Sequence, residues 1–216
     1  YKQVDHLQSM IKKYQLAFRN YRDSVEIILV INGPEDGSYA LIKKIIQNDQ
    51  KFVVKRIAGA GWGLGVLEGL KIAKGSFLCF TNSARTDVSD LLRILAYAKV
   101  NDQTVVKATR MVRESWLRRL GSVIYNFEYR LLFNAPVWDV NGTPKVLPKK
   151  IYQELKLKDV GNLIDAECIA KCFAKNIPVL EVPIKSTQRL GGKSTTWIIP
   201  AIHMYIDLIK LKKNLW

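Results

Sequence analysis

Polar side chains follow two apolar segments of the chain that have the composition of buried strands. The segment 25–31 runs into Asn32-Gly-Pro-Glu-Asp36, and the segment 76–81 runs into Asn82-Ser-Ala-Arg-Thr-Asp87. In an open parallel sheet, the carboxyl ends of the strands form the edge at which ligands bind. These residues are therefore candidate ligand contacts, although two ordinary strand-to-helix turns would have the same composition.

A glycine-rich segment in the first half of the chain is a candidate dinucleotide-binding loop by composition, but its spacing fails. Gly59 and Gly61 would need a third glycine at the position of Leu64. The segment also does not follow the first strand, as that motif requires. A dinucleotide cofactor is therefore not expected.

A second candidate phosphate loop lies near the end of the chain. Gly192-Lys-Ser194 has the last residues of a P-loop, but Thr187 stands where that motif needs its first glycine. Arg189 and Lys193 lie beside glycines, so charge and backbone N–H groups there are suited to holding a phosphate.

Apolar segments alternate with amphipathic segments along the chain, and this alternation predicts the fold class. Strands are expected at 25–31, 52–55, 76–81, 104–107 and 179–183, and helices at 2–20, 38–48, 66–74, 91–98, 165–175 and 197–213. Such alternation predicts an α/β fold with a mostly parallel central sheet flanked by helices. We expect one domain over 1–196 and a separate amphipathic helix over 197–216.

The chain is strongly basic. It has 34 Lys and Arg against 19 Asp and Glu, a formal charge of +15. Such an excess predicts a polyanionic partner: nucleic acid, an anionic bilayer or a phosphorylated substrate. Nucleic acid is the weakest of these, because no nucleic-acid-binding motif is recognisable. The three cysteines are odd in number and lack metal-site spacing, which favours a reducing compartment.

The order of these segments resembles the family-two glycosyltransferases, in particular the branch of dolichol-phosphate mannose synthases and polyprenyl-phosphate sugar transferases. The stretches that carry the resemblance are Val30–Ser38 (V-D-D-G-S-x-D-G-T in the family), Gly61–Gly75 (G-x-G-x-A-x-x-x-G-x-x-x-A-x-G), Thr109-Arg110 (S-R), Asp139–Val146 (D-x-N-x-x-P-K), Asp165–Glu167 (F-D-x-E) and Val179–Ile184 (x-x-E-V-P-I). Tyr1 falls on the tyrosine that closes the family's first strand, so we expect that central strand to precede Tyr1.

The resemblance implies a GT-A fold that transfers a sugar from a nucleotide-diphosphate sugar to a polyprenyl or dolichyl phosphate or a glycolipid. Positions that match the family's nucleotide-sugar site are Tyr1, Asn32, Gly33, Asp36, Gly61, Gly63, Asn82, Ala84 and Arg85. The expected catalytic residues are Asp139, Asp165 and Glu167, and the expected contacts to the acceptor phosphate are Arg110, Arg118, Arg119, Arg189 and Lys193. Asp165 is preferred over Glu167 as general base, and N-capping of its helix is the alternative role for Asp165.

The metal-binding D-x-D motif of the family is lost. Asn82-Ser-Ala84 stands in its place, so both carboxylates that would hold Mg²⁺ or Mn²⁺ are missing. An amide is a poor replacement for a carboxylate and alanine is none. We expect weak or no divalent-metal binding there, and no cofactor is firmly predicted. Arg85 could neutralise a diphosphate in place of the metal; the alternative is a solvated loop charge.

The lost motif leaves a second interpretation of the whole chain open. It could be a catalytically inactive glycosyltransferase-fold protein that serves as a binding or partner subunit at a membrane. A third interpretation, a nucleic-acid-binding module, rests on the charge alone.

The last predicted helix has the features of a helix that lies in a bilayer interface. Its apolar residues recur at 198, 199, 202, 205, 206 and 209, three lysines follow at 210, 212 and 213, and Trp197 and Trp216 bracket it. The segment 114–134 is a second basic and aromatic stretch. We therefore expect an anionic membrane surface as a partner and a peripheral location on a cytoplasmic face. The alternative is that both helices pack on the core.

Overall fold

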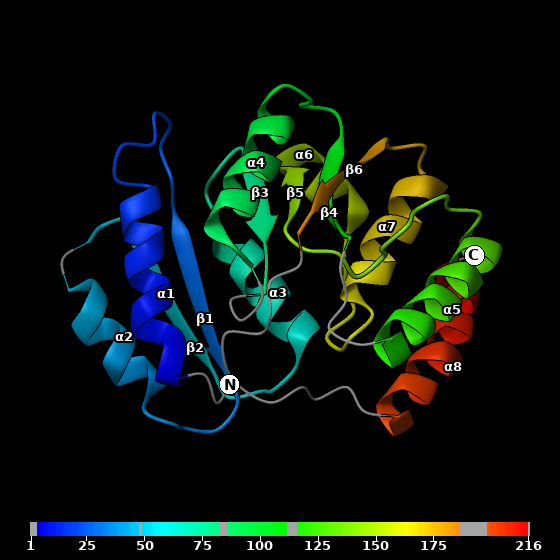
Figure 1. The fold of residues 1–216 in the computed structure, drawn as a ribbon, viewed down its shortest axis with the longest axis horizontal. Coiled ribbons are helices and arrows are strands. Elements are labelled where there is room, and N and C mark those ends of the chain that lie inside the picture. Colours follow the sequence, from blue (N-terminus) through cyan, green and yellow to red (C-terminus); the bar gives the residue numbers. More distant parts are fainter. Residues whose placement is uncertain (1–3, 48, 83–85, 112–115, 186–197, 216) are drawn as a thin grey trace.

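The chain folds into two β-sheets with helices packed around them, as seen in a computed structural model (Figure 1). The structure describes residues 4–47, 49–82, 86–111, 116–185 and 198–215. The strands are β1 (Ile27–Asn32), β2 (Phe52–Ile57), β3 (Phe77–Phe80), β4 (Val105–Arg110), β5 (Lys145–Pro148) and β6 (Val179–Ile184). The helices are α1 (Val4–Ala17), α2 (Ser38–Ile46), α3 (Trp62–Ile72), α4 (Val88–Lys99), α5 (Trp116–Phe133), α6 (Lys149–Leu155), α7 (Ile164–Ala174) and α8 (Ile198–Leu215).

The strands are mostly parallel, as the sequence predicts, with one exception. β1 and β2 form a parallel pair, and the second sheet has the order β3-β5-β4-β6. β4 and β6 are parallel, whereas β5 runs antiparallel to both of its neighbours. β3 and β4 therefore run in the same direction, and their carboxyl ends lie at the same edge.

The sheet is divided between β1 and β3, which are not hydrogen-bonded to each other. α3 spans the division, because it packs against both strands.

Alternating residues of the four-stranded sheet pack against helices on its two faces. On one face Val106 and Val146 pack with Ile94 of α4. On the other face Val105 and Leu147 pack with α3, α6 and α7. Side chains along a strand alternate between faces, so an apolar run that is buried on both sides forms a central strand.

The first half of the chain has its own apolar cluster. Ile11 of α1 and Ile42 of α2 pack with Ile27 and Phe52 of the β1–β2 pair. This cluster explains why Val4–Ala17, within the segment predicted as an amphipathic helix, forms α1.

α5 and α8 lie at the end of the molecule opposite α1 and α2, and α8 packs against both α5 and α7 (Figure 1). Tyr129 of α5 and Leu208 of α8 are fully buried and belong to one cluster with Ile169 of α7. The predicted final helix therefore packs one side on the domain, and its separation as a unit from 1–196 stays a prediction. Within the described parts of the chain, we find no helix with the length and apolarity to cross a bilayer.

The sequence did not indicate β5 and α6, and it placed the start of α3 too late. β5 is four residues long, follows Pro144 and ends at Pro148, and these prolines hide it among turn residues. α3 begins at Trp62, inside the segment expected to be a glycine-rich loop. Its glycines are needed for packing, because a Cβ at Gly63 would lie 2.3 Å from the carbonyl oxygen of Asp159.

This close approach makes substitution of Gly63 a test of the fold. Gly63→Ala must push the backbone of residues 159–161 away, so we expect a loss of about 1–3 kcal/mol of unfolding free energy. Gly121→Ala in α5 is the matched control, since nothing lies within 4 Å of its added Cβ. Alanine should stabilise that helix by about 0.5–1 kcal/mol. Urea denaturation of both variants checks this, and equal midpoints would contradict the packing described here.

Candidate functional site

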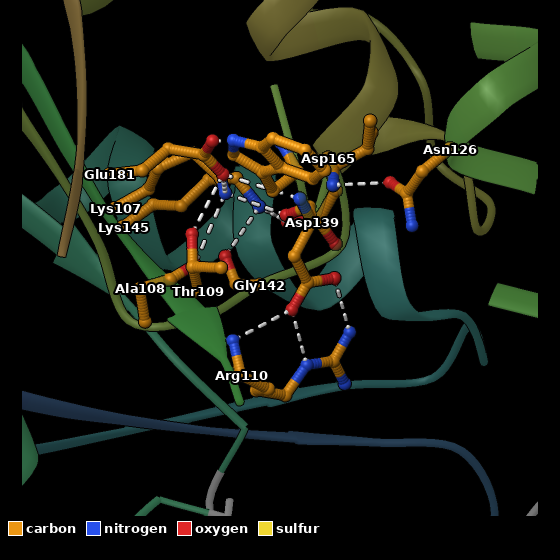
Figure 2. Close-up of polar contacts among 12 residues, drawn as sticks. Lys107, Ala108, Thr109, Arg110, Asn126, Asp139, Gly142, Lys145, Asp165 and Glu181 are labelled. Atoms are coloured by element: carbon orange, nitrogen blue, oxygen red, sulfur yellow. Dashed lines mark hydrogen bonds and ion pairs between the residues drawn. The ribbon is translucent and has the colours of Figure 1, made fainter. Parts of the chain in front are cut away.

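Two lysines with no exposed surface lie side by side on neighbouring strands, Lys107 within β4 and Lys145 at the start of the antiparallel β5. Lys107 of β4 forms an ion pair of 2.7 Å with Glu181 of β6, its register partner in the parallel pair. Its ammonium group also donates to the carbonyl oxygens of Ala108 (3.1 Å) and Asp139 (2.6 Å). Figure 2 shows these contacts converging on one point. A buried lysine tolerates its charge only with such partners.

Lys145 holds Asp165 in the same cluster. Its ammonium group forms an ion pair with Oδ1 of Asp165 and donates to the carbonyl oxygen of Gly142 at 2.9 Å. The other carboxylate oxygen of Asp165 accepts from Nε1 of Trp62 at 2.8 Å. Asp165 is thus fixed between β5 and the start of α3.

The alternative role for Asp165, an N-cap, is wrong. The N-cap of α7 is Leu163, and Asp165 lies within the first turn. A carboxylate at this position still interacts favourably with the positive end of the helix dipole.

Asp139 forms a bidentate ion pair with Arg110 at the end of β4. Nε and Nη2 of Arg110 lie 2.7 and 2.8 Å from the carboxylate oxygens, and the Arg110 backbone N–H also donates to them. Burial disfavours the charged guanidinium, but the hydrogen bonds and charge of Asp139 outweigh this and raise the pKa of Arg110. Arg110 is thus held by a carboxylate inside the protein, and its predicted contact with an acceptor phosphate stays a prediction.

Asp139 and Asp165, which the sequence proposes as catalytic, are therefore brought together (Figure 2). Glu167 is not brought into this cluster. It accepts hydrogen bonds from the backbone N–H groups of Lys158 and Asp159 and from Lys171. These contacts fix the loop before α7, so Glu167 positions backbone.

The glycines predicted to contact a nucleotide sugar make backbone contacts of their own. The N–H groups of Gly63 and Leu64 donate to the carbonyl oxygens of Gly161 and Val160, both at 2.8 Å. These are two of the four N–H groups that a helix start leaves unpaired. The loop at 159–161 thus satisfies them in place of a phosphate.

Asn32 links the end of β1 to the start of α3. Its side-chain amide donates to the carbonyl oxygen of Gly61 at 2.6 Å, and Gly33 donates its N–H to Gly59 at 3.2 Å. The side chain of Asp36 accepts from the N–H of Ser38, the first residue of α2, at 3.1 Å. Asn32, Gly61 and Trp62 connect the end of β1 to Asp165.

The end of β3, where the family motif is lost, offers no carboxylate. Asn82 accepts a hydrogen bond at its backbone carbonyl from Thr86 at 2.9 Å. Ser83 is not an acidic ligand, and within the described ranges no three His, Cys, Asp or Glu side chains form a metal-binding group. These residue types do not fit a divalent-metal site, so the chemistry of the site is derived from protein groups alone.

Several predicted site residues lie outside the described residues: Tyr1, Ala84, Arg85, Arg189 and Lys193. Arg118 belongs to α5, but its side chain is outside the description too. Arg119 is exposed on α5.

Sequence reasoning missed Lys107, Lys145, Trp62 and Glu181. A signal was present for the two lysines, because each stands alone among apolar residues of a strand, in Val-Val-Lys-Ala and Pro-Lys-Val-Leu. Lysine is almost never fully buried without a partner, so a single charge in an apolar strand indicates a buried ion pair.

Burial lowers the pKa of Lys107 to about 8, with a further contribution from the charge of Lys145, while Glu181 and Asp139 oppose the shift. An unfolded lysine titrates near 10.5, so between about pH 8 and 10.5 the unfolded chain binds more protons than the folded one. The contribution of Lys107 to stability should therefore rise with pH across this window. Relative to Lys107→Met, we expect the wild-type unfolding free energy to gain about 2–3 kcal/mol between pH 8 and 10. Parallel curves for the two proteins in urea denaturation would contradict this.

Comparison with known proteins matches the sequence of this chain to a family. The sequence profile described as "Glycosyl transferase family 2" matches residues 6–156. A curated relative is the undecaprenyl-phosphate 4-deoxy-4-formamido-L-arabinose transferase of Edwardsiella ictaluri, 22% identical over 213 residues. The match covers 97% of this chain and 64% of that protein, so the chain spans less than two thirds of its relative.

Solved structures share the fold at low identity. Glucosyl-3-phosphoglycerate synthase from Mycobacterium tuberculosis, in complex with Mn²⁺, UDP and glucosyl-3-phosphoglycerate, has a TM-score of 0.73 and 13% identity, over 98% of this chain and 76% of that one. A mannosyltransferase from Pyrobaculum calidifontis in complex with GDP-Man and Mn²⁺ has a TM-score of 0.58 and 11% identity, over 90% of this chain and 56% of that one. The chain has the expected GT-A fold and belongs to glycosyl transferase family 2.

Proposed function

We propose that this chain transfers a sugar from a nucleotide-diphosphate sugar to a lipid-phosphate acceptor. The observation that carries the proposal is the convergence of Asp139 and Asp165 on one buried cluster of ion pairs, in which Arg110 stands at the end of β4. Family membership, a relative named for transfer to undecaprenyl phosphate and structures that bind UDP or GDP-Man support it.

The cluster is suited to the two demands of glycosyl transfer. The reaction develops negative charge on the leaving diphosphate and requires an oriented oxygen nucleophile on the acceptor. Arg110, at the end of β4, is the partly exposed cation of the cluster and is held in place by Asp139, whereas Lys107 and Lys145 are buried and paired with Glu181 and Asp165. Asp165 is oriented from two sides, so it can accept a proton from a hydroxyl acceptor. A phosphate acceptor carries its negative charge already, and then Asp165 serves to hold Lys145.

The membrane assignment extends this proposal. A lipid-linked acceptor requires the chain to work at a bilayer surface. All three cysteines are free, which fits the reducing compartment of a cytoplasmic face. The alternative of an inactive partner subunit gains no support, because the matched relatives carry transferase or synthase names.

Replacement of the central carboxylate tests the assignment. We expect Asp165→Asn to lower sugar transfer from UDP- or GDP-sugars to polyprenyl phosphate by about 100-fold or more, since Lys145 loses its carboxylate partner and is left as a buried, unpaired charge. Asp102→Asn, at an exposed position after α4, should leave the rate unchanged. A radiolabelled-sugar assay measures both. Full activity of Asp165→Asn, in a variant that melts like wild type, would refute the assignment.

The missing metal ligands give a separate prediction. Because Asn82 and Ala84 replace carboxylates, nucleotide-diphosphate binding by the wild-type chain should change by less than about threefold between EDTA and Mn²⁺. Asn82→Asp/Ala84→Asp restores the acidic motif and should gain Mn²⁺-dependent binding. Isothermal titration calorimetry with UDP and GDP checks both proteins. A strong Mn²⁺ requirement in the wild type would show that other residues supply the ligands.

A further inference from the structure

The outer face of α5 is apolar and exposed. Six large side chains, each between 49% and 72% exposed, make up this face: Trp116, Leu120, Val123, Ile124, Phe127 and Leu131. An α-helix advances by about 100° per residue, so these six lie within an arc of about 100°. They form one continuous stripe along the helix.

The same helix has a second apolar face, on the opposite side. Tyr125, Tyr129 and Phe133 are buried there in the cluster shared with α7 and α8. A surface helix normally carries a single apolar stripe, which faces the core. The core already covers one face of α5. An exposed apolar face of this size indicates an interaction with another apolar surface.

Basic and aromatic residues border the outer face. Arg119 is exposed beside it, and the guanidinium of Arg130 lies 5.0 Å from the ring centre of Trp138, itself 71% exposed. α8, packed against α5, exposes Ile206 and Ile209. Each of the two helices carries three basic residues and a single acid.

We propose that the outer face of α5 lies in the interface of an anionic lipid leaflet, with its basic border at the headgroups. An apolar stripe with arginine, lysine and tryptophan at its margins is the pattern of helices that lie in bilayer interfaces. A second copy of the chain fits less well, because it would bring an identical basic border and a charge of +15 against this one. An anionic surface instead complements that charge.

The helix that carries this outer face is hydrogen-bonded to the segment that carries Asp139. Asn126 of α5 accepts a hydrogen bond from the N–H of Val140 at 2.8 Å, and the N–H of Trp138 donates to Glu181 at 2.7 Å. Asp139 is the residue between these two in the chain. A leaflet bound to α5 would therefore be next to the segment that carries Asp139, which is where a lipid-linked acceptor must arrive. This part of the inference rests on the proposed function.

The structure favours α5 over the final helix as the part of the chain that contacts a membrane. The sequence pointed first to 197–213, but Leu208 of α8 is buried and Tyr205 donates to the carbonyl oxygen of Gly121. Among the side chains of these two helices that the structure describes, α5 exposes six large apolar ones and α8 exposes Ile206 and Ile209.

Vesicle flotation of the full chain tests the proposal without any substrate. We expect wild type to float with vesicles of phosphatidylcholine and phosphatidylglycerol in a ratio of about two to one, and more weakly with phosphatidylcholine alone. Phe127→Ser/Leu131→Ser should lower the partition coefficient by about tenfold or more, because two large side chains no longer enter the interface. Leu16→Ser/Val100→Ser is the matched control: it removes two apolar side chains that are 71% and 79% exposed on other elements, and should float like wild type.

Leu120→Ser is a milder second variant on the same face, in case the double variant folds poorly, and should float less well than wild type. Equal flotation of the outer-face variants and the Leu16→Ser/Val100→Ser control would overturn the proposal. So would a wild-type dimer that does not float and that Phe127→Ser/Leu131→Ser converts to a monomer, since a second copy would then cover the face. Flotation without turnover of any nucleotide sugar would count against the proposed function alone.

Discussion

The structure depends on neutralising two lysines that are buried completely. Lys107 and Lys145 have no exposed surface, and each is paired with a carboxylate, Glu181 or Asp165, that comes from a distant part of the sequence. Removing one partner of a buried ion pair typically costs about 3–5 kcal/mol, because the other charge is left unpaired. These two pairs therefore fix β4, β5, β6 and the start of α7 relative to one another.

The same ion pairs orient the side chains of the proposed site. A carboxylate that is held from two sides, as Asp165 is by Lys145 and Trp62, is oriented before a substrate arrives. Asp139 is fixed in the same way by Arg110 and by the segment that hydrogen-bonds to α5. The ion pair of Arg110 and Asp139 and the helix α5, with its apolar outer face, are thus joined through the segment that carries Asp139. The proposed transfer to an acceptor at a membrane surface accounts for both of these features.

Sequence periodicity predicted the elements that are long and regular, and family resemblance supplied Asp139 and Asp165. Periodicity did not reveal β5 and α6, because these elements have only four and seven residues and a periodic pattern needs more residues than that to be recognised. The partners of Lys107 and Lys145 lie 74 and 20 positions away. Such pairings arise only once β6 has been placed beside β4 and α7 beside β5. The exposure of the outer face of α5 was likewise beyond the sequence, since both of its faces are apolar.

A crystal structure of the chain with a bound, non-transferable nucleotide-diphosphate sugar is the most direct test of the central claim. The account predicts the diphosphate at the ends of β1 and β3, and the sugar directed toward the cluster, with its ring within roughly 4 Å of the Asp165 carboxylate. A sugar bound with its reactive carbon on the far side of the sheet from Asp139 and Asp165 would contradict it.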